Sequence, residues 1–126
     1  YEDVDGDGDA ACQDCDDNNP AVHSLAVESC NAVDDDCDGL VDEAGATGES
    51  TWYLDGDGDS YGRASWSEVA CNAPAGFVAD SSDCDDNNNL ISPNATEVCN
   101  GFDDNCNVVI DEGFDLWEVS QEVCVA

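Results

Sequence analysis

The chain has 126 residues and carries 32 acidic side chains against one lysine or arginine, for a formal charge of -31. Nucleic acids and anionic membrane surfaces repel such a chain, so we expect neither as a partner. A compact protein of this charge also repels itself unless bound cations offset the charge. Nine cysteines and 41% hydrophobic residues argue against disorder and indicate a disulfide-bonded protein of an oxidising, extracellular compartment.

The chain contains two copies of one unit. Residues 14–43 align without gaps to residues 83–112, and an acidic, glycine-rich stretch precedes each block. The second copy inserts residues 61–82 between stretch and block, where the first copy has only residues 10–13. The expected segments, in chain order, are a shortened first repeat at 1–43, a linker at 44–50, a second repeat at 51–112 and a C-terminal strand segment at 113–126.

Short strands are the only regular structure that the sequence predicts. Residues 51–54 have the aromatic and β-branched character of a strand, and residues 76–79 are its predicted hairpin partner. Residues 116–125 alternate loosely and predict a terminal strand. Amphipathic periodicity never lasts beyond about two helical turns, so we expect no long helix. The predicted fold class is mostly irregular and all-β-leaning: a small, disulfide-rich, calcium-stabilised tandem repeat. No apolar run approaches the ~20 residues that cross a membrane, so we expect no membrane insertion.

Oxygen-bearing side chains recur at alternate positions in three clusters per copy. Such alternation lets a tight loop fold several oxygens around one hard cation, and interleaved glycines permit the sharp turns. In the first copy the clusters are Asp5, Asp7 and Asp9; Asp14, Asp16 and Asn18; and Asp34, Asp36 and Asp38. In the second copy they are Asp55, Asp57 and Asp59; Asp83, Asp85 and Asn87; and Asp103, Asn105 and Asn107.

Further ligands are expected from the backbone and from more distant carboxylates. In a calcium loop the ligand after the side chains is a backbone carbonyl two residues on, which predicts the carbonyls of Tyr61, Leu40 and Val109. No bidentate glutamate stands at loop position twelve, so these loops are not EF-hands. The candidates for the remaining oxygens are Glu28, Asp42, Glu43, Glu97, Asp111 and Glu112. We expect Glu28 and Glu97 to reach across the loop as bidentate ligands.

Calcium is the cation that these ligands favour. The chain has no methionine and one histidine, whereas zinc and copper prefer imidazole and thiolate ligands. Magnesium demands a near-ideal octahedron and keeps several waters, so crowded, flexible carboxylates suit calcium better. We expect several calcium ions, with Leu40, Val41 and residues 108–110 anchoring the acidic loops to a small core.

The cysteines are expected to form disulfides rather than to bind metal. The shared spacing in the two blocks predicts Cys30–Cys37 and Cys99–Cys106, and Cys71–Cys84 would brace the second hairpin. Three alternatives stay open for Cys12, Cys15 and Cys124. Cys12 pairs with Cys15 and leaves Cys124 over, or Cys124 reaches Cys12 or Cys15 of a neighbouring subunit, or Cys124 belongs to a third repeat of a longer chain.

No catalytic constellation is present, so we expect a protein that is not an enzyme. The single His23 has no recognisable nucleophile motif beside it, and no cleft is predicted that could hold two catalytic carboxylates. Arg63, the only strong cation, either pairs with a loop carboxylate or lies at the surface. Asn94 opens an N-glycosylation sequon on a predicted loop and is a candidate glycan site.

The order of these motifs resembles the MopE-type metal-binding repeat of bacterial extracellular and surface proteins. Residues 55–62, 83–88 and 97–112 show the resemblance in the second copy, and residues 14–43 show it in the first. The resemblance implies an extracellular repeat that binds metal. The family name comes from a copper-linked protein, but the residues do not favour copper. The acidic spacing is also similar to thrombospondin type 3 repeats, which use calcium in place of a large core.

The second copy departs from the pattern where Asn105, Asn107 and Val108 replace Asp36, Asp38 and Gly39. The loss of two charges and a turn glycine bears directly on the affinity of that site.

A structural function fits these features best: a calcium-stiffened segment of an extracellular surface fibre, stalk or adhesin. The alternative is a secreted metal-handling protein that buffers or scavenges calcium or copper. The first copy lacks a return strand, and residues 115–124 form a spare segment at the other end. An unpaired edge invites an added strand, which predicts head-to-tail self-association into a filament.

Overall fold

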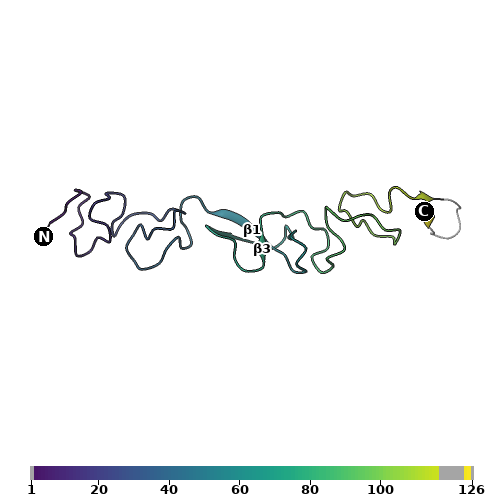
Figure 1. The fold of residues 1–126 in the computed structure, drawn as a ribbon, viewed down its shortest axis with the longest axis horizontal. Coiled ribbons are helices and arrows are strands. Elements are labelled where there is room, and N and C mark those ends of the chain that lie inside the picture. Colours follow the sequence, from purple (N-terminus) through teal and green to yellow (C-terminus); the bar gives the residue numbers. More distant parts are fainter. Residues whose placement is uncertain (1, 117–123, 126) are drawn as a thin grey trace. The chain divides into compact units, whose positions relative to one another are not determined.

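The computed structural model describes residues 2–116 and 124–125 of the chain. Its five strands are β1 (Ser50–Leu54), β2 (Ser67–Ala70), β3 (Phe77–Val78), β4 (Asp115–Leu116) and β5 (Cys124–Val125). Long irregular loops connect the strands (Figure 1). The described residues include no helix of the length and apolar character that a membrane span requires. The predicted small, mostly irregular, disulfide-rich fold is confirmed.

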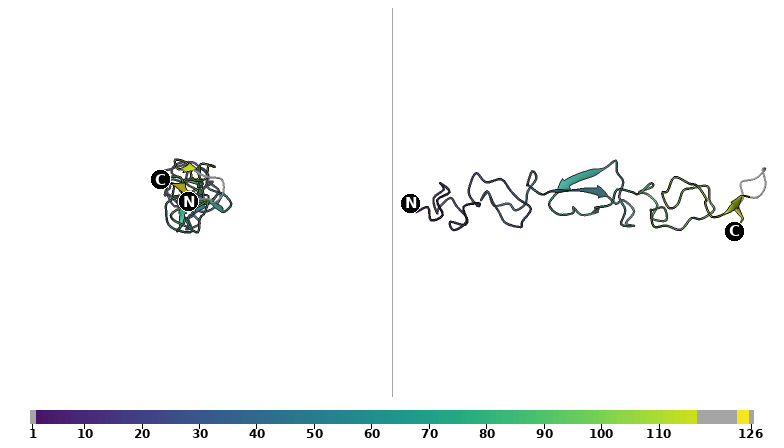
Figure 2. Two further views of the ribbon diagram at one scale, coloured as in Figure 1. Left: turned by 90° about the vertical axis from the view of Figure 1, so that its right-hand side faces the viewer. Right: turned by 90° about the horizontal axis from the view of Figure 1, so that it is seen from above.

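A three-stranded sheet with the order β2-β1-β3 is the largest regular element. Strand β1 forms because its Thr-Trp-Tyr sequence suits a pleated, half-buried surface. It pairs antiparallel with β3, with Tyr53 opposite Val78 and Leu54 opposite Phe77. Figures 1 and 2 draw strands of this sheet as neighbouring arrows. The predicted hairpin is therefore confirmed. Strand β2 was not predicted, because its Ser-Glu-Val-Ala sequence is mostly exposed and has no apolar alternation.

The predicted single strand over residues 116–125 is wrong. Asp115 lies opposite Val125 and Leu116 opposite Cys124, in an antiparallel pair of two-residue strands, β4 and β5. The two ends of the stretch therefore run in opposite directions. Residues 117–123 lie outside the described residues.

The chain divides into two compact units that interleave along the sequence. Unit 1 comprises Tyr1–Thr51 and Val69–Asn72, and unit 2 comprises Trp52–Glu68 and Ala73–Ala126. Residues 44–50, which we expect to be a linker, belong to unit 1. There Ala46 is buried, and Thr47 exchanges backbone hydrogen bonds with Glu28 and Cys30.

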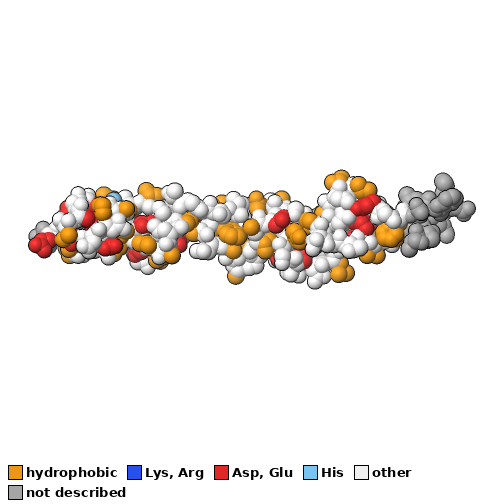
Figure 3. Space-filling model, turned by 45° about the horizontal axis from the view of Figure 1, so that its top comes forward, with side chains coloured by type: hydrophobic (Ala, Val, Ile, Leu, Met, Phe, Trp, Pro, Cys, Tyr) orange, Lys and Arg blue, Asp and Glu red, His pale blue; other side chains and the backbone are white. Residues whose placement is uncertain are grey.

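The hydrophobic core is very small. Among the described residues only Val22, Ala46 and Ile91 are buried hydrophobic side chains. Hydrophobic and acidic side chains are interspersed on the surface that Figure 3 shows. The expected apolar anchors are wrong: Leu40, Val41 and all of residues 108–110 are exposed, Val108 to 92%. Three buried side chains cannot form a core that would hold these loops, so hydrogen bonds and disulfides hold them.

Equivalent disulfides join the start of each block to its last acidic loop. Cys15–Cys37 and Cys84–Cys106 share a sequence separation of 22 and a Cα–Cα distance of 5.6 Å. A third bond joins Cys30 to Cys71 within unit 1. Cys99 is also disulfide-bonded. Among the described side chains Cys12 is free and exposed, and the side chain of Cys124 lies outside the described set.

The predicted pairs Cys30–Cys37, Cys99–Cys106, Cys71–Cys84 and Cys12–Cys15 are therefore wrong. Cys37 adopts a left-handed backbone with φ of 62°, and its Sγ accepts a hydrogen bond from the Cys15 N–H at 3.1 Å. The chain from Cys30 to Cys37 wraps around a buried glutamate, Glu28, so their equal spacing in the two blocks does not bring these cysteines together.

Candidate metal centre

The first acidic stretch of each copy forms a tight loop around its leading aspartate. Asp3 accepts hydrogen bonds from the Gly6 and Gly8 N–H groups at 2.6 and 3.2 Å. Asp55 accepts the equivalent bonds from residues 58 and 60 at 2.6 and 3.0 Å. Asp3 therefore corresponds to Asp55, two residues away from the expected register. The missed signal was the shared Tyr-x-Asp-x-Asp-Gly-Asp sequence that begins at residues 1 and 53.

Carboxylates of these loops converge with the first aspartate of the following block. We name the groups cluster A1 (Asp3, Asp5, Asp7, Asp14) and cluster A2 (Asp55, Asp57, Asp59, Asp83). Oxygens of Asp3, Asp5 and Asp7 lie within 4.8 Å of one another. Burial, together with the carboxylates of Asp7 and Asp14, raises the pKa of Asp5. Burial also raises the pKa of Asp83, helped by Asp59 and Asp57.

Both A clusters contain buried oxygens that no protein group satisfies. These are one Oδ2 atom each of Asp5, Asp7, Asp14, Asp57, Asp59 and Asp83. An unpaired buried carboxylate is costly unless a cation or donor meets it. The two clusters therefore offer the oxygen ligands that a hard divalent cation binds, and several of these oxygens have no other partner.

Five expected ligands of these regions lie outside clusters A1 and A2. Asp9 turns to Ser24, whose N–H donates to it at 2.7 Å, and the hydrogen bonds from Ser24 lower the pKa of Asp9. The second predicted cluster does not form a loop of its own, because Asp14 and Asp83 join clusters A1 and A2. Asp16 and Asn18 are exposed. In the second copy Asn87 donates to Asp85 at 3.4 Å.

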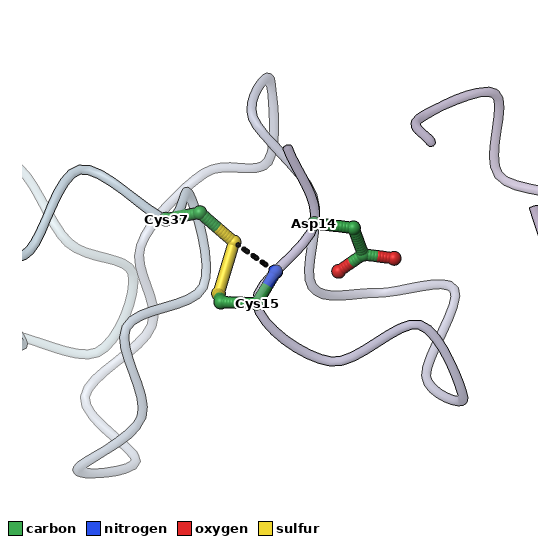
Figure 4. A group of neighbouring side chains, drawn as sticks. All are labelled: Asp14, Cys15 and Cys37. Carbon is green, nitrogen blue, oxygen red and sulfur yellow. Dashed lines mark hydrogen bonds between the residues drawn. A yellow bond between two sulfur atoms is a disulfide. The ribbon is translucent and has the colours of Figure 1, made fainter. Parts of the chain in front are cut away.

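Asp14 also lies beside the Cys15–Cys37 disulfide. A carboxylate oxygen of Asp14 and the two sulfurs lie within 4.8 Å of one another. Figure 4 shows the sulfurs bonded to each other and the Asp14 carboxylate turned from them. Neither sulfur is a thiolate, so this group is not a soft-metal site in the oxidised protein.

The third predicted cluster of the first copy forms as expected. We name it cluster B1 (Glu28, Asp34, Asp36, Asp38, Glu43). Oxygens of Asp34, Asp36 and Asp38 lie within 4.8 Å of one another, as do those of Glu28, Asp36 and Glu43. A hydrogen bond from its own backbone N–H lowers the pKa of Glu43, but burial and the carboxylates of Glu28 and Asp38 outweigh it and raise that pKa. Glu43 Oε2 is buried without a hydrogen-bond donor.

Glu28 and Glu97 hold the B loops from inside. Glu28 is only 5% exposed. Its Oε1 accepts the N–H groups of Asp35 and Asp36 at 2.6 and 2.9 Å, and its Oε2 accepts that of Asp42 at 3.1 Å. Glu97 accepts the N–H groups of residues 105 and 111 at 2.8 and 3.1 Å. Both glutamates stabilise the loop through these backbone hydrogen bonds. Their role as bidentate ligands stays a prediction.

Asp42 and Asp111 are backbone clamps. Asp42 Oδ1 accepts the N–H groups of Asn31 and Ala32 at 2.9 and 3.0 Å. Asp111 Oδ1 makes the equivalent bonds to residues 100 and 101 at 2.9 and 3.1 Å. Their carboxylates thereby tie the end of each block to a turn 11 residues earlier in the sequence.

Three buried aspartates were missed by the sequence reasoning: Asp35, Asp104 and Asp86, the last of which is described below. Asp35 and Asp104 are 6% and 3% exposed. Each accepts the side-chain amide of the asparagine four residues earlier, Asn31 or Asn100, at 3.1–3.2 Å to its two oxygens. The available signal was that Asn-x-x-x-Asp spacing, present in both blocks.

The matching loop of the second copy is cluster B2 (Glu97, Asp103, Asn105, Asn107, Glu112). Its backbone repeats that of B1, but its composition differs. The side-chain amides of Asn105 and Asn107 both donate to Glu112 Oε1, the first at 2.7 Å. The hydrogen bond from Asn105 lowers the pKa of Glu112 against the opposing effect of burial.

Arg63 pairs with a buried aspartate beside cluster A2. Its Nε lies 2.8 Å from Asp86 Oδ2, and Asp86 also accepts the Gly56 N–H at 2.6 Å. Of the two open readings for Arg63, pairing with a carboxylate is the one observed. In the first copy the counterpart Asp17 accepts the Val4 N–H at 3.0 Å.

Comparison with known families agrees with the site geometry. Residues 14–43 and 83–112 match a copper-binding MopE family model described as "Putative metal-binding motif". The two blocks are therefore similar to MopE-type metal-binding motifs. Each MopE-type block contains a whole B cluster and the closing aspartate of an A cluster. The acids at 3, 5 and 7 and at 55, 57 and 59 lie outside the matched residues. No curated protein and no solved structure matches the chain.

Proposed function

We propose that the protein is a structural calcium-binding module, in which calcium ions occupy clusters A1, A2 and B1. The observation that carries the proposal is the set of buried carboxylate oxygens without donors in these clusters. All are hard ligands, which calcium accepts six to eight at a time with flexible geometry.

Copper fits the described residues less well, despite the copper-linked family name. Soft copper sites use thiolate or thioether ligands and cupric sites favour imidazole. The chain has no methionine and a single histidine, and Cys15, Cys37, Cys84 and Cys106 are consumed in disulfides.

Calcium would supply the stability that the core cannot. With three buried hydrophobic side chains among the described residues, little apolar surface drives folding. A site filled at about 100 times its Kd contributes roughly 2.7 kcal/mol, and several sites would approach the ~5–15 kcal/mol of an ordinary domain. The ions would also neutralise carboxylates that otherwise repel one another.

Removing calcium tests the proposal. We expect EDTA to lower the melting temperature sharply, as measured by circular dichroism, and calcium at roughly 10⁻⁴–10⁻³ M to restore it. Asp57→Asn in cluster A2 should weaken calcium binding, whereas Glu68→Gln on exposed strand β2 removes the same charge and should not. A melting temperature unchanged by EDTA would falsify the proposal.

The alternative is a metal-handling role, which the copper-linked family description favours. A buffering protein would bind calcium or copper without depending on it for its fold. Isothermal titration with each metal, paired with melting curves, separates the two roles. Copper binding at lower concentrations than calcium, with an intact apo fold, would favour metal handling.

We extend the proposal to an extracellular segment of a surface fibre or adhesin stalk that assembles head to tail. The disulfides support an oxidising location. Besides the head-to-tail contact, the exposed Cys12 thiol offers a covalent Cys12–Cys12 link between the first repeats of two chains. The pairing of β4 with β5 supplies a partner for the tail segment, so the joint need not use that strand. Mass photometry with calcium and without reductant should show oligomers, and the Cys12→Ser variant should show fewer of them. A uniform monomer would exclude covalent assembly through Cys12.

A further inference from the structure

Clusters B1 and B2 have the same backbone framework. Asp34 accepts the N–H groups of Asp38 and Gly39 at 3.2 and 3.0 Å. Asp103 accepts those of Asn107 and Val108 at 3.1 and 2.7 Å. The two loops therefore differ in the chemistry of their inward side chains rather than in their path.

The inward side chains repel one another in B1 and are hydrogen-bonded in B2. Asp36 and Asp38 are carboxylates that have no hydrogen to donate, and Glu43 Oε2 is left without a donor. In B2 the corresponding positions are Asn105 and Asn107, and both amides donate to Glu112 Oε1.

We propose that the amides of Asn105 and Asn107 take the place of a bound cation in cluster B2. The loop at residues 103–112 then keeps its fold without calcium, while the loop at residues 34–43 requires it. This inference rests on the proposed calcium function and assigns the two MopE-type blocks different roles.

Charge supports the same division. B1 brings together five carboxylates, and B2 three with two neutral amides. Calcium affinity falls as the number of charged ligands falls, so B2 is also the weaker site. Glu112 Oε2 remains without a donor, which leaves B2 one free oxygen toward an ion, while Oε1 is already hydrogen-bonded.

Hydrogen exchange read by mass spectrometry tests the inference within one molecule. In EDTA we expect backbone amides of residues 34–43 to exchange at least about tenfold faster than those of residues 103–112, the ratio that one retained hydrogen bond can produce. In calcium both segments should be protected. Equal acceleration of both segments by EDTA overturns the inference and leaves the calcium function standing.

Matched variants identify the amides as the cause. The double variant N105D/N107D should make residues 103–112 exchange rapidly in EDTA and recover protection in calcium. N72D/N89D adds the same two charges at exposed asparagines and should leave that segment unchanged. V108G tests the loss of the turn glycine, another sequence difference between the loops, and should not create a calcium requirement.

The outcomes separate the two proposals. If EDTA accelerates neither segment, the loop at residues 34–43 does not require calcium, and both the calcium function of cluster B1 and the inference fail. If EDTA accelerates only residues 34–43 but leaves exchange unchanged in N105D/N107D, the inference alone is overturned. The reciprocal D36N/D38N variant should slow the exchange of residues 34–43 in EDTA; if that segment unfolds further, the amides do not substitute for a cation.

Discussion

Val108 has a left-handed backbone conformation, which is unfavourable for a β-branched side chain. It has φ of 76°, where the first copy has Gly39 with φ of 95°. The left-handed region costs a non-glycine residue about 1–3 kcal/mol, whereas glycine loses roughly 0.5–1 kcal/mol in unfolded-state entropy. We expect Val108→Gly to stabilise the protein by about 1 kcal/mol, measured by urea denaturation in calcium. Gly39→Val should destabilise it, and a loss of stability in Val108→Gly would contradict the argument.

Glu28 is expected to be the most sensitive single residue of the first block. Replacing it with alanine leaves the N–H groups of Asp35, Asp36 and Asp42 without their acceptor. Unsatisfied buried donors cost about 1–3 kcal/mol each, so we expect a loss of about 3 kcal/mol or more. The loss should appear in calcium-saturated urea denaturation, while the exposed Glu68→Ala serves as control. A loss no larger than that of the control would contradict the stabilising role of these hydrogen bonds.

Residue spacing predicted part of the site correctly. Alternation in Asp34, Asp36 and Asp38 placed cluster B1, because side chains two apart in a tight loop share one side. Spacing could not separate ligands from clamps, since Asp42 and Asp111 are as acidic as their neighbours. What distinguishes them is the backbone N–H that each one meets, and the sequence does not show that directly.

At the scale of elements, the disulfides hold the loops together. Cys15–Cys37 closes a loop of 22 residues in sequence separation, for which the chain-entropy account gives roughly 3 kcal/mol. We expect C15S/C37S to lose about that much and to lower the calcium affinity of the first copy. Denaturation and calcium titration check it, and a loss below about 1 kcal/mol would contradict the estimate. Non-reducing peptide mapping should recover the 15–37, 30–71 and 84–106 links.

The strands were easier to predict than the cysteine pairs. Strand β1 is recognisable because aromatic and β-branched residues are adjacent in it, which is a local property. A disulfide depends on where two distant segments meet. Equal cysteine spacing in the two blocks indicates only that both blocks form the same pairs. Both the expected pairs (30–37 and 99–106) and the observed pairs (15–37 and 84–106) have equal spacing in the two blocks, so spacing could not distinguish them.

For the whole molecule, pH should act in opposite directions with and without calcium. Burial, followed by neighbouring carboxylates, raises the pKa of Asp5, Asp57 and Asp83. An acid with a raised folded pKa binds its proton more tightly in the folded state, so its stabilisation grows as pH falls through that raised pKa and is lost as pH rises. Asp9 and Glu112 have lowered pKa values, so the stability that they contribute is lost only when the pH falls through those values, below the usual range for carboxyl groups.

We therefore expect the melting temperature of calcium-depleted protein to rise on acidification from about pH 7 to about pH 5. With calcium bound, the same acidification should lower it, because protons compete with the ion for the carboxylates. Circular dichroism melts on calcium-depleted and calcium-saturated samples check both slopes. If the melting temperature of the calcium-depleted sample decreases as the pH is lowered, the carboxylates do not repel one another in the folded protein.

The Cys30–Cys71 bond sets an order of events during biosynthesis. Its cysteines are 41 residues apart, and the acidic loop of cluster A2 is made between them. A chain emerging N-terminus first exposes the Cys30 thiol beside Cys37 and Cys12 well before its native partner exists. Oxidation at that stage favours the nearby, incorrect partners, so correct maturation calls for a disulfide isomerase or slow oxidation. A fragment ending at residue 50, where the repeat pattern suggests a boundary, would leave Cys30 without its partner permanently and is expected to form mixed dimers.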